Sequence, residues 1–449
     1  MKVSKVLLFT FLALFLGVSA SAQFRSLMKK ANKEYELNAY NQAIETYKQA
    51  LERRPDDPEA LGNMADCYRY LNEMMEAAKY YARSIAQKKV EARHILNYAH
   101  VLKALGQYDE AKRWYLEYAK DDPMVGNHYA QTCDFAKNQR QVSTGLLVNN
   151  EEKVNSPASD FGPTFVQGQI VFSSARIDVQ RSSAENYDGQ QPNQLYVARQ
   201  GTDGLLENPY FVGSSTGQQD YNKGPISVSP DGKWIAYTKN NFVNGTRHIP
   251  SSGMQLSLYI AEVNPNGAWV NEQPFPYNGV DFSTGFPCFS PDGNALYFAS
   301  NRPDDGFGGY DIYVSNRTGN TWGRPENLGP VVNTPGDELT PYHDGEDLFF
   351  ASDWHPGFGG FDIYRVIRAN NRWNQIYHIG NPVSSPHDDY GLIYDKSRNL
   401  GYFVSNRSDG QGMEDIYSVS RPAESIVLSV KNASSGEPIP NALLDFTNC

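Results

Sequence analysis

The sequence predicts a multidomain protein: an all-α solenoid, then an all-β propeller, then the start of a β-sandwich. Two internal repeats support this prediction. Alanines and tyrosines recur every 34 residues near the N-terminus, and units of four short strands recur further along the chain. The composition agrees, because 29 Tyr, 22 Phe, 37 Gly and 26 Pro in 449 residues are typical of many short strands joined by turns.

The first 22 residues have the features of a secretory signal peptide. "MKVSK" is positively charged, "VLLFTFLALFLGV" is apolar, and Ala20-Ser21-Ala22 is a small-residue cleavage pattern. The apolar run is shorter than the ~20 residues that a membrane-spanning helix needs. We therefore expect residues 1–22 to be removed and the mature protein to be exported. The alternative is an uncleaved membrane anchor.

Residues 23–140 carry the helical repeat. Three sets of residues share the spacing of 34: Ala31, Ala65 and Ala99; Ala43, Ala77 and Ala111; and Tyr47, Tyr81 and Tyr115. Small alanines suit the places where paired helices approach closely, and the aromatic rings fill the gap to the next unit. The pattern resembles the tetratricopeptide repeat (TPR), which pairs two antiparallel helices per unit. The resemblance implies three repeats, a capping helix at 124–139, and a concave face that binds a peptide or helix of a partner. A rigid spacer is the alternative.

Residues 141–422 change to short aromatic and β-branched runs separated by turn residues. Five units can be aligned, at 161–213, 224–279, 285–329, 339–380 and 389–422. Each contains four strand-like runs, which is typical of β-propeller blades, and "SPDG" at 290–293 is a tight turn between two of them. The units resemble WD40-like repeats of the SPDG class, as in TolB-type propellers. Five blades are expected. A sixth would need 143–156 to pair with 425–430, whereas 143–149 could instead close the ring within the last blade.

A glycine-rich loop recurs in three units: "GFGGYDIY" at 306–313, "GFGGFDIY" at 357–364 and "QGMEDIY" at 411–417. A phosphate-binding loop would need a helix N-terminus after the glycines, but a strand follows. We therefore interpret it as the loop between the second and third strands of a blade. Asp311, Asp362 and Asp415 are expected to bind nearby backbone N–H groups rather than calcium or a substrate.

Few residues suggest a functional site. Arg302, Arg407 and Trp354 follow second strands and are candidate partner-binding residues on one rim of the ring; the alternative for the arginines is pairing with local Asp. No catalytic, cofactor-binding or metal-binding residue is assigned. There is no G-x-S-x-G motif, the histidines lack ligand spacing, and the four cysteines form no C-x-x-C pair. A net charge of -11 argues against a nucleic-acid partner. We expect a protein that is not an enzyme and needs no cofactor.

Residues 423–449 resemble the opening of a carboxypeptidase-regulatory-like domain, an Ig-like β-sandwich. The stretch is far shorter than the roughly 100 residues of a complete sandwich, so we expect the chain to be a fragment.

The order of these parts resembles the periplasmic, outer-membrane-associated proteins of Bacteroidetes that end in an OmpA-like domain, including the PorE-like proteins of type IX secretion. The resemblance implies a non-enzymatic scaffold that binds envelope and secretion-system proteins through the TPR and propeller parts. Peptidoglycan binding would belong to the OmpA-like domain, which this sequence lacks. Two alternatives are a glycan- or peptide-binding propeller with a ligand site at the channel mouth, and a hydrolase acting there.

Overall fold

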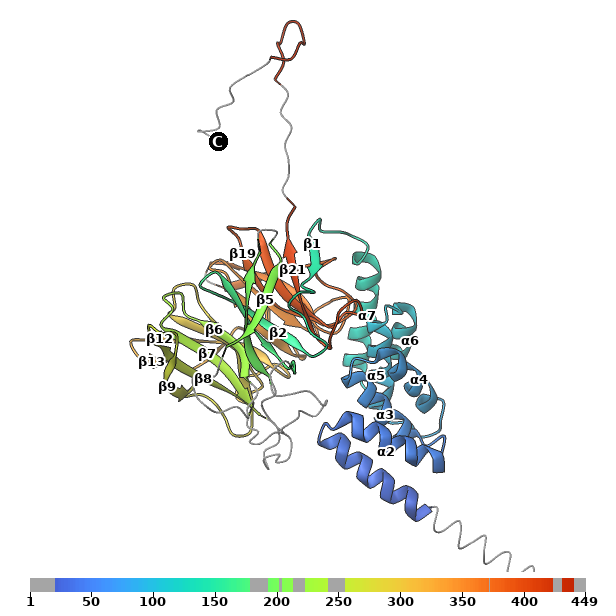
Figure 1. Ribbon diagram of the computed structural model, residues 1–449. Coiled ribbons are helices and arrows are strands. Elements are labelled where there is room, and N and C mark those ends of the chain that lie inside the picture. The colour runs from blue at the N-terminus through green and yellow to red at the C-terminus, as the bar shows by residue number, and fades with distance from the viewer. Residues whose placement is uncertain are drawn as a thin grey trace, which may run out of the picture.

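The computed structural model describes residues 21–177, 193–201, 204–212, 223–240, 255–370, 372–422 and 430–439. Seven helices are followed by five antiparallel sheets (Figure 1). Residues 1–20 of the predicted signal peptide, and most of 423–449, lie outside the described residues. Within 430–439 a short hairpin forms around the bridge between Lys431 and Pro438. The sandwich itself stays a prediction.

The helices form three antiparallel pairs and one final helix, as the spacing of 34 predicts. They are a helix that includes residues 21–36, α2 (Tyr40–Arg53), α3 (Pro58–Tyr70), α4 (Met74–Ile85), α5 (Ala92–Ala104), α6 (Tyr108–Tyr118) and α7 (Pro123–Gln139). Asp57 and Asp122 begin α3 and α7, because each carboxylate accepts a backbone N–H at 3.1 Å and the following proline occupies the first helical position. The repeated alanines and the tyrosines Tyr47, Tyr81 and Tyr115 have no exposed surface.

The last helix, α7, differs from the expected cap. A cap presents a polar outer face to solvent, but α7 lies against the propeller (Figure 1). Its His128 and Phe135 contact Trp354 and Phe358 of the propeller, and Phe358 belongs to the hydrophobic core of the helical array. The array and the propeller therefore share a packed interface.

The described strands form five blades of antiparallel strands. The blades are β2 (Asp160–Val166), β3 (Gln169–Ser174), β4 (Gln194–Gln200) and β5 (Leu206–Phe211); β6 (Lys223–Val228), β7 (Trp234–Asn240), β8 (Leu256–Val263) and β9 (Trp269–Pro274); β10 (Thr284–Phe289), β11 (Ala295–Ser300), β12 (Asp311–Thr318), β13 (Thr321–Trp322) and β14 (Glu326–Asn327); β15 (Glu338–His343), β16 (Asp347–Ser352), β17 (Asp362–Ala369) and β18 (Arg372–His378); and β19 (Asp389–Asp395), β20 (Leu400–Ser405) and β21 (Asp415–Ser420) with β1 (Leu147–Asn150). We number them blades 1 to 5 in this order.

Strand β1 decides the blade count. It pairs with β21, with Leu147 opposite Ser420, and so supplies the outer strand of blade 5. This is the ring closure that the sequence offered for 143–149. In the described residues, the segment 143–149 therefore belongs to blade 5 and does not start a sixth blade.

The second strand of each blade is almost continuously apolar because both of its faces are covered. Alternate side chains of a strand point to opposite faces. In β11, Leu296 and Phe298 pack toward blade 2, while Tyr297 and Ala299 pack toward blade 4. Equivalent clusters fill the other three gaps between blades. The hydrophobic core of the propeller thus consists of five clusters, one between each pair of neighbouring blades around the ring.

Candidate functional site

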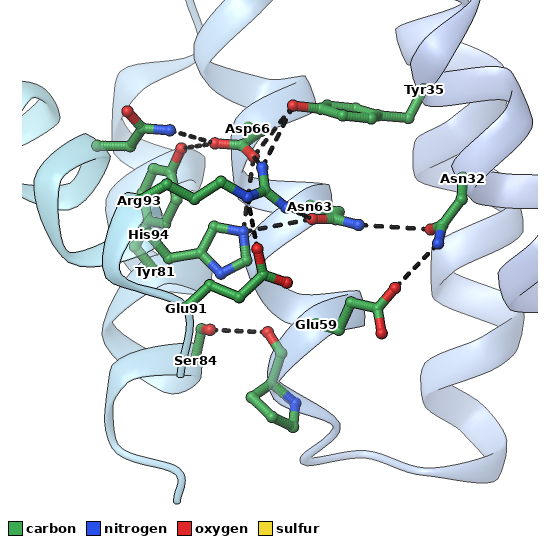
Figure 2. Close-up of polar contacts among 12 residues, drawn as sticks. Asn32, Tyr35, Glu59, Asn63, Asp66, Tyr81, Ser84, Glu91, Arg93 and His94 are labelled. Atoms are coloured by element: carbon green, nitrogen blue, oxygen red, sulfur yellow. Dashed lines mark hydrogen bonds and ion pairs between the residues drawn. The ribbon is translucent and has the colours of Figure 1, made fainter. Parts of the chain in front are cut away.

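A polar network in the helical array is built from the first helix of each repeat. Asn32 and Tyr35 come from the first helix, Asn63 and Asp66 from α3, and Arg93 from α5 (Figure 2). Positions three or four residues apart share one face of a helix. The stacking of successive units then places these faces side by side.

Asp66 is the centre of this polar network. Its side chain has no exposed surface, and it accepts hydrogen bonds from Arg93 at 2.6 Å, Asn97 at 2.8 Å, Tyr35 at 3.2 Å and the Tyr81 hydroxyl. Burial by itself would raise the pKa of Asp66. The donors and the nearby positive charge outweigh that effect and hold the pKa below its usual value.

The sequence reasoning missed the residues of this network, although a signal for them exists. Contacts between neighbouring repeats join residues 31 apart: Asn32 with Asn63, Asn63 with His94, Tyr35 with Asp66, and Asp66 with Asn97. The interval is one helical turn shorter than the repeat itself. Polar residues recurring at this interval were therefore the sign of a polar network that runs from one repeat to the next.

The partly exposed members of this network carry little net charge. Arg93 keeps 39% of its side chain exposed, yet it is already paired with Asp66 and with Glu91 at 2.7 Å. The side-chain amide of Asn32 adds a neutral polar group beside it, bonded to Glu59 at 2.9 Å. Neutral amides and a neutralised Arg suit the backbone of an extended peptide or the polar face of a helix.

The interface between the two domains is the second part of the candidate site. The loop Gly357–Gly360 of blade 4 inserts Phe358, which has no exposed surface, against α6 and α7. The Tyr108 hydroxyl donates to the Phe358 carbonyl at 3.0 Å, and the Phe135 ring lies 5.9 Å from the Phe358 ring, centroid to centroid. The glycine-rich loop of blade 4 is therefore a docking element.

Trp354 belongs to the same interface. Its ring stacks on His128 of α7 at 4.1 Å between centroids, and His128 Nε2 lies 2.7 Å from the Trp354 carbonyl oxygen. Burial lowers the pKa of His128. Trp354 thus contacts a partner surface within its own chain. Whether it binds a further protein stays a prediction.

A cavity of about 300 Å³ lies between the domains. Lys103 of α5 lines it and is 3% exposed, facing Asp353 and Asp388 across the cavity. Burial lowers the pKa of Lys103 and raises the pKa of Asp353 to about 7. The interface therefore contains opposite charges from its two walls, in addition to apolar contacts.

Arg302 and Arg407 lie inside their blades. Arg407 pairs at 2.5 Å with Asp389, which is completely buried, and this is the local pairing given above as the alternative. Arg302 is 9% exposed and forms no ion pair with another described residue. It donates to the Tyr277 carbonyl and lies over the ring of Tyr313. Their predicted role in binding a partner is untested, and the described geometry shows each occupied within the propeller.

Among the described residues, Arg407 forms an ion pair and Arg302 does not, because only some blades have a buried acid at the start of the inner strand. Asp160 and Asp389 pair with Arg176 and Arg407. In blade 4 the acid is Glu338, but Trp354 stands where those blades have Arg. Glu338 is held by Thr334 and Ser352, and burial raises its pKa to about 8.

The glycines of the "GFGG" loops are required by the neighbouring blade. A Cβ on Gly308 would lie 2.3 Å from the Pro335 carbonyl carbon, and one on Gly359 would lie 2.1 Å from the His387 carbonyl oxygen. The aspartates that follow cap the loops, as expected: Asp311 accepts the Phe307 N–H at 2.6 Å and Asp362 the Gly359 N–H at 2.9 Å. The loop therefore joins the second and third strands and seals one blade against the next.

The centre of the ring holds another cavity, of about 210 Å³, lined by the inner strands of all five blades. Each inner strand changes register at this level. Phe286 and Thr340 take up positive φ angles there, at 56° and 51°, a conformation that bulky and β-branched residues rarely adopt.

Three further properties concern the described residues only. Cys67, Cys133 and Cys288 are free and buried, while Cys449 lies outside the described part. No group of three or more His, Cys, Asp or Glu side chains in that part is arranged to hold a metal ion. Among its helices, none combines the length and the apolar character needed to cross a membrane.

Two family models match the helical part. A TPR repeat model covers residues 31–84 and a tetratricopeptide repeat model covers residues 93–120. No curated protein matches the chain.

Solved structures resemble the two parts separately. The first TPR of Spaghetti (RPAP3) bound to the HSP90 peptide SRMEEVD is 21% identical, over 26% of this chain and 95% of that one, with a TM-score of 0.25. TolB from Acinetobacter baumannii is 16% identical over 59% of this chain and 54% of its own, with a TM-score of 0.32. A glycoside hydrolase is 9% identical over 67% and 98%, with a TM-score of 0.43. At these identities and TM-scores, we draw no functional conclusion from the likenesses. In the described residues, the chain consists of TPR repeats followed by a five-bladed β-propeller.

Proposed function

We propose that this protein is a non-enzymatic scaffold that binds other proteins through its TPR array and its propeller. The main support is the polar network around the buried Asp66, to which all three repeats contribute and whose outer members are partly exposed. TPR arrays use such surfaces to bind partners. The packed interface between array and propeller would hold the two binding domains in one orientation.

The finer proposal concerns place and partners. The N-terminal signal-peptide pattern and the resemblance in domain order support an exported, periplasmic, outer-membrane-associated protein. Its partners would be envelope proteins of a type IX-like secretion machine. A C-terminal OmpA-like domain outside this sequence would provide the link to the cell wall.

A pull-down from cell envelopes with the full chain tests the scaffold. We expect the double variant Asn32→Ala, Arg93→Ala to recover less of at least one envelope protein than the wild type. Arg83→Ala, an exposed change on α4, is the control and should recover the same proteins as the wild type. Recovery of no envelope protein by the wild type, or equal recovery by the double variant, would contradict the proposal.

The propeller channel supports a second candidate, a glycan- or peptide-binding site. The observation in its favour is the cavity of about 210 Å³ together with the unusual backbone of Phe286 and Thr340 at its wall. A glycan array with a thermal-shift screen tests it. A ligand present at about 100 times its Kd should stabilise the protein by about 2.7 kcal/mol. No shift with any glycan or short peptide would exclude this candidate for those ligands.

A further inference from the structure

Two loops of the propeller share the sequence Gly-Phe-Gly-Gly, and of these two only the blade 4 loop meets another domain in the described structure. Phe358 in the blade 4 loop is fully buried against the TPR helices. Phe307, at the matching position of the blade 3 loop, is 47% exposed. A single exposed apolar side chain is common on protein surfaces. Phe307 is notable because the equivalent residue of blade 4, Phe358, already contacts a pair of helices.

Both loops are anchored to the segment that enters the next blade. Tyr310 N–H donates to Asp337 at 2.7 Å, and Phe361 N–H donates to Asp388 at 2.9 Å. Each loop also rests its glycines on the segment that enters the next blade. The Phe307 side chain is therefore held on a fixed loop in the manner of Phe358.

The blade 4 loop binds a pair of helices. Tyr108 of α6 donates to the Phe358 carbonyl, and Phe135 of α7 packs on the Phe358 ring. Among the described residues, the helix pair at the end of the TPR array is already occupied by blade 4. We therefore look for an equivalent occupant of Phe307 in another molecule.

The surroundings of the two loops differ in charge. Asp304 and Asp305, both exposed, precede Gly306, whereas His355 and Pro356 precede Gly357. Two carboxylates beside an aromatic side chain favour a partner with an apolar pocket edged by Lys or Arg.

The surface is also continuous with the established interface. A Cβ on Gly308 would meet Pro335, and one on Gly336 would lie 2.6 Å from Trp354 Cβ, the residue that stacks on α7. A helix pair on Phe307 would thus lie next to the chain's own TPR array.

We propose that the Phe307 loop is a docking site for a helical hairpin of TPR type on a partner protein, with basic side chains opposite Asp304 and Asp305. The inference rests on the proposed scaffold function and names one partner class for it.

Photo-crosslinking in the host cell tests this in the full chain. p-Benzoyl-phenylalanine replaces Phe307, and the matched control places it at Tyr377, which is 43% exposed on blade 4. We expect a crosslink specific to position 307, mapped by mass spectrometry to a helical hairpin bearing Lys or Arg in another protein. The additional changes Asp304→Lys and Asp305→Lys should lower its yield about tenfold.

Three results would overturn the proposal: no crosslink above the Tyr377 control, a crosslink to a segment that is not a helical hairpin, or a crosslink only to a second copy of this chain. The envelope pull-down separates the two claims. If Phe307→Ser still recovers the wild-type partners and position 307 does not crosslink, the result supports the scaffold function and contradicts the docking site at Phe307.

Discussion

Blades 3 and 4 share nearly the same sequence around their second and third strands but have different surroundings. In blade 3, Arg302 lies over Tyr313 inside the blade and Phe307 is exposed. In blade 4, Trp354 and Phe358 take the corresponding places and both meet the TPR helices. The strands and glycines that make a blade are unchanged, so the repeated motif specifies the blade. What the blade binds depends on one side chain after the second strand and on where the helical array lies.

The acids at the starts of the inner strands extend this comparison. Glu338 of blade 4 lies opposite Ser352, and the matching residue of blade 3 is Thr284, opposite Ser300. Blade 3 thus has the Arg without the acid, blade 4 has the acid without the Arg, and blade 5 has both. Four predictions follow this comparison in order of decreasing effect.

The largest effect is expected where an acid and an Arg are both present. Arg407→Met leaves the buried Asp389 without its partner, and we expect the free energy of unfolding to fall by about 3–5 kcal/mol. Arg302→Met removes the hydrogen bond to the Tyr277 carbonyl and the contact with aromatic rings, and should cost about 2 kcal/mol. Chemical denaturation of both variants measures the difference. Equal losses would mean that the ion pair is not what distinguishes the blades.

The second largest effect is expected from replacing Phe358, which should lower stability more than replacing Phe307. Phe358→Ala empties a buried site between the domains and is expected to cost about 3 kcal/mol, and to loosen the TPR array from the propeller. Phe307→Ala removes an exposed side chain and should change stability by less than about 0.5 kcal/mol. Calorimetry gives the stabilities, and small-angle scattering reports the domain arrangement. An unchanged arrangement in Phe358→Ala would argue against its role as the docking residue.

The glycines should behave alike in the two blades. Gly308→Ala and Gly359→Ala each place a Cβ within 2.3 Å of backbone atoms of the next blade, so each should cost about 1–3 kcal/mol. Thermal unfolding measures both, with Gly323→Ala as a control whose Cβ would have one neighbour, at 3.1 Å. A large loss in only one blade would show that the two loops are not built alike.

The smallest effect at neutral pH concerns Glu338. Its pKa is raised from 4.5 to about 8 in the folded state, so the folded protein holds a proton that the unfolded chain releases. Stability should therefore decrease as pH rises from about 4.5 through about 8. Glu338→Gln should remove part of this decrease, since an amide does not titrate.

Unfolding at pH 5 and pH 8.5 measures this dependence. The variant should gain stability relative to the wild type only at the higher pH. Parallel pH profiles for the two proteins would contradict the assignment.

Much of the fold followed from repeats that can be read along the chain. The 34-residue spacing of Ala and Tyr located the helix pairs, because helix packing needs small residues where axes approach. The "SPDG" turns and "DIY" strands located the blades, because a blade buries both faces of its second and third strands. The interface was not predictable in this way. Nothing in "GFGG" distinguishes Phe358 from Phe307, and the burial of one depends on helices more than 200 positions away in the chain.

The sequence predicted what kind of site to expect, but not which residues form it. A binding surface on the concave face of the TPR array was expected. The residues proposed for it came only from the structure, because contacts between repeats join positions 31 apart rather than 34. Arg302, Arg407 and Trp354 were grouped by their place after the second strand. The structure separates them: Arg407 turns inward to a buried acid and Arg302 turns inward over the Tyr313 ring, whereas Trp354 turns toward α7.

The sequence by itself determined the two repeat architectures, their order, and the glycine positions that allow neighbouring blades to touch. These properties depend on local periodicity and on steric needs that each unit repeats. Tertiary structure alone decided that β1 closes the fifth blade, that α7 packs on the propeller instead of facing solvent, and which of two identical loops is covered. The reason is physical: these outcomes depend on contacts between segments far apart in the chain, and such contacts leave no periodic trace in the sequence.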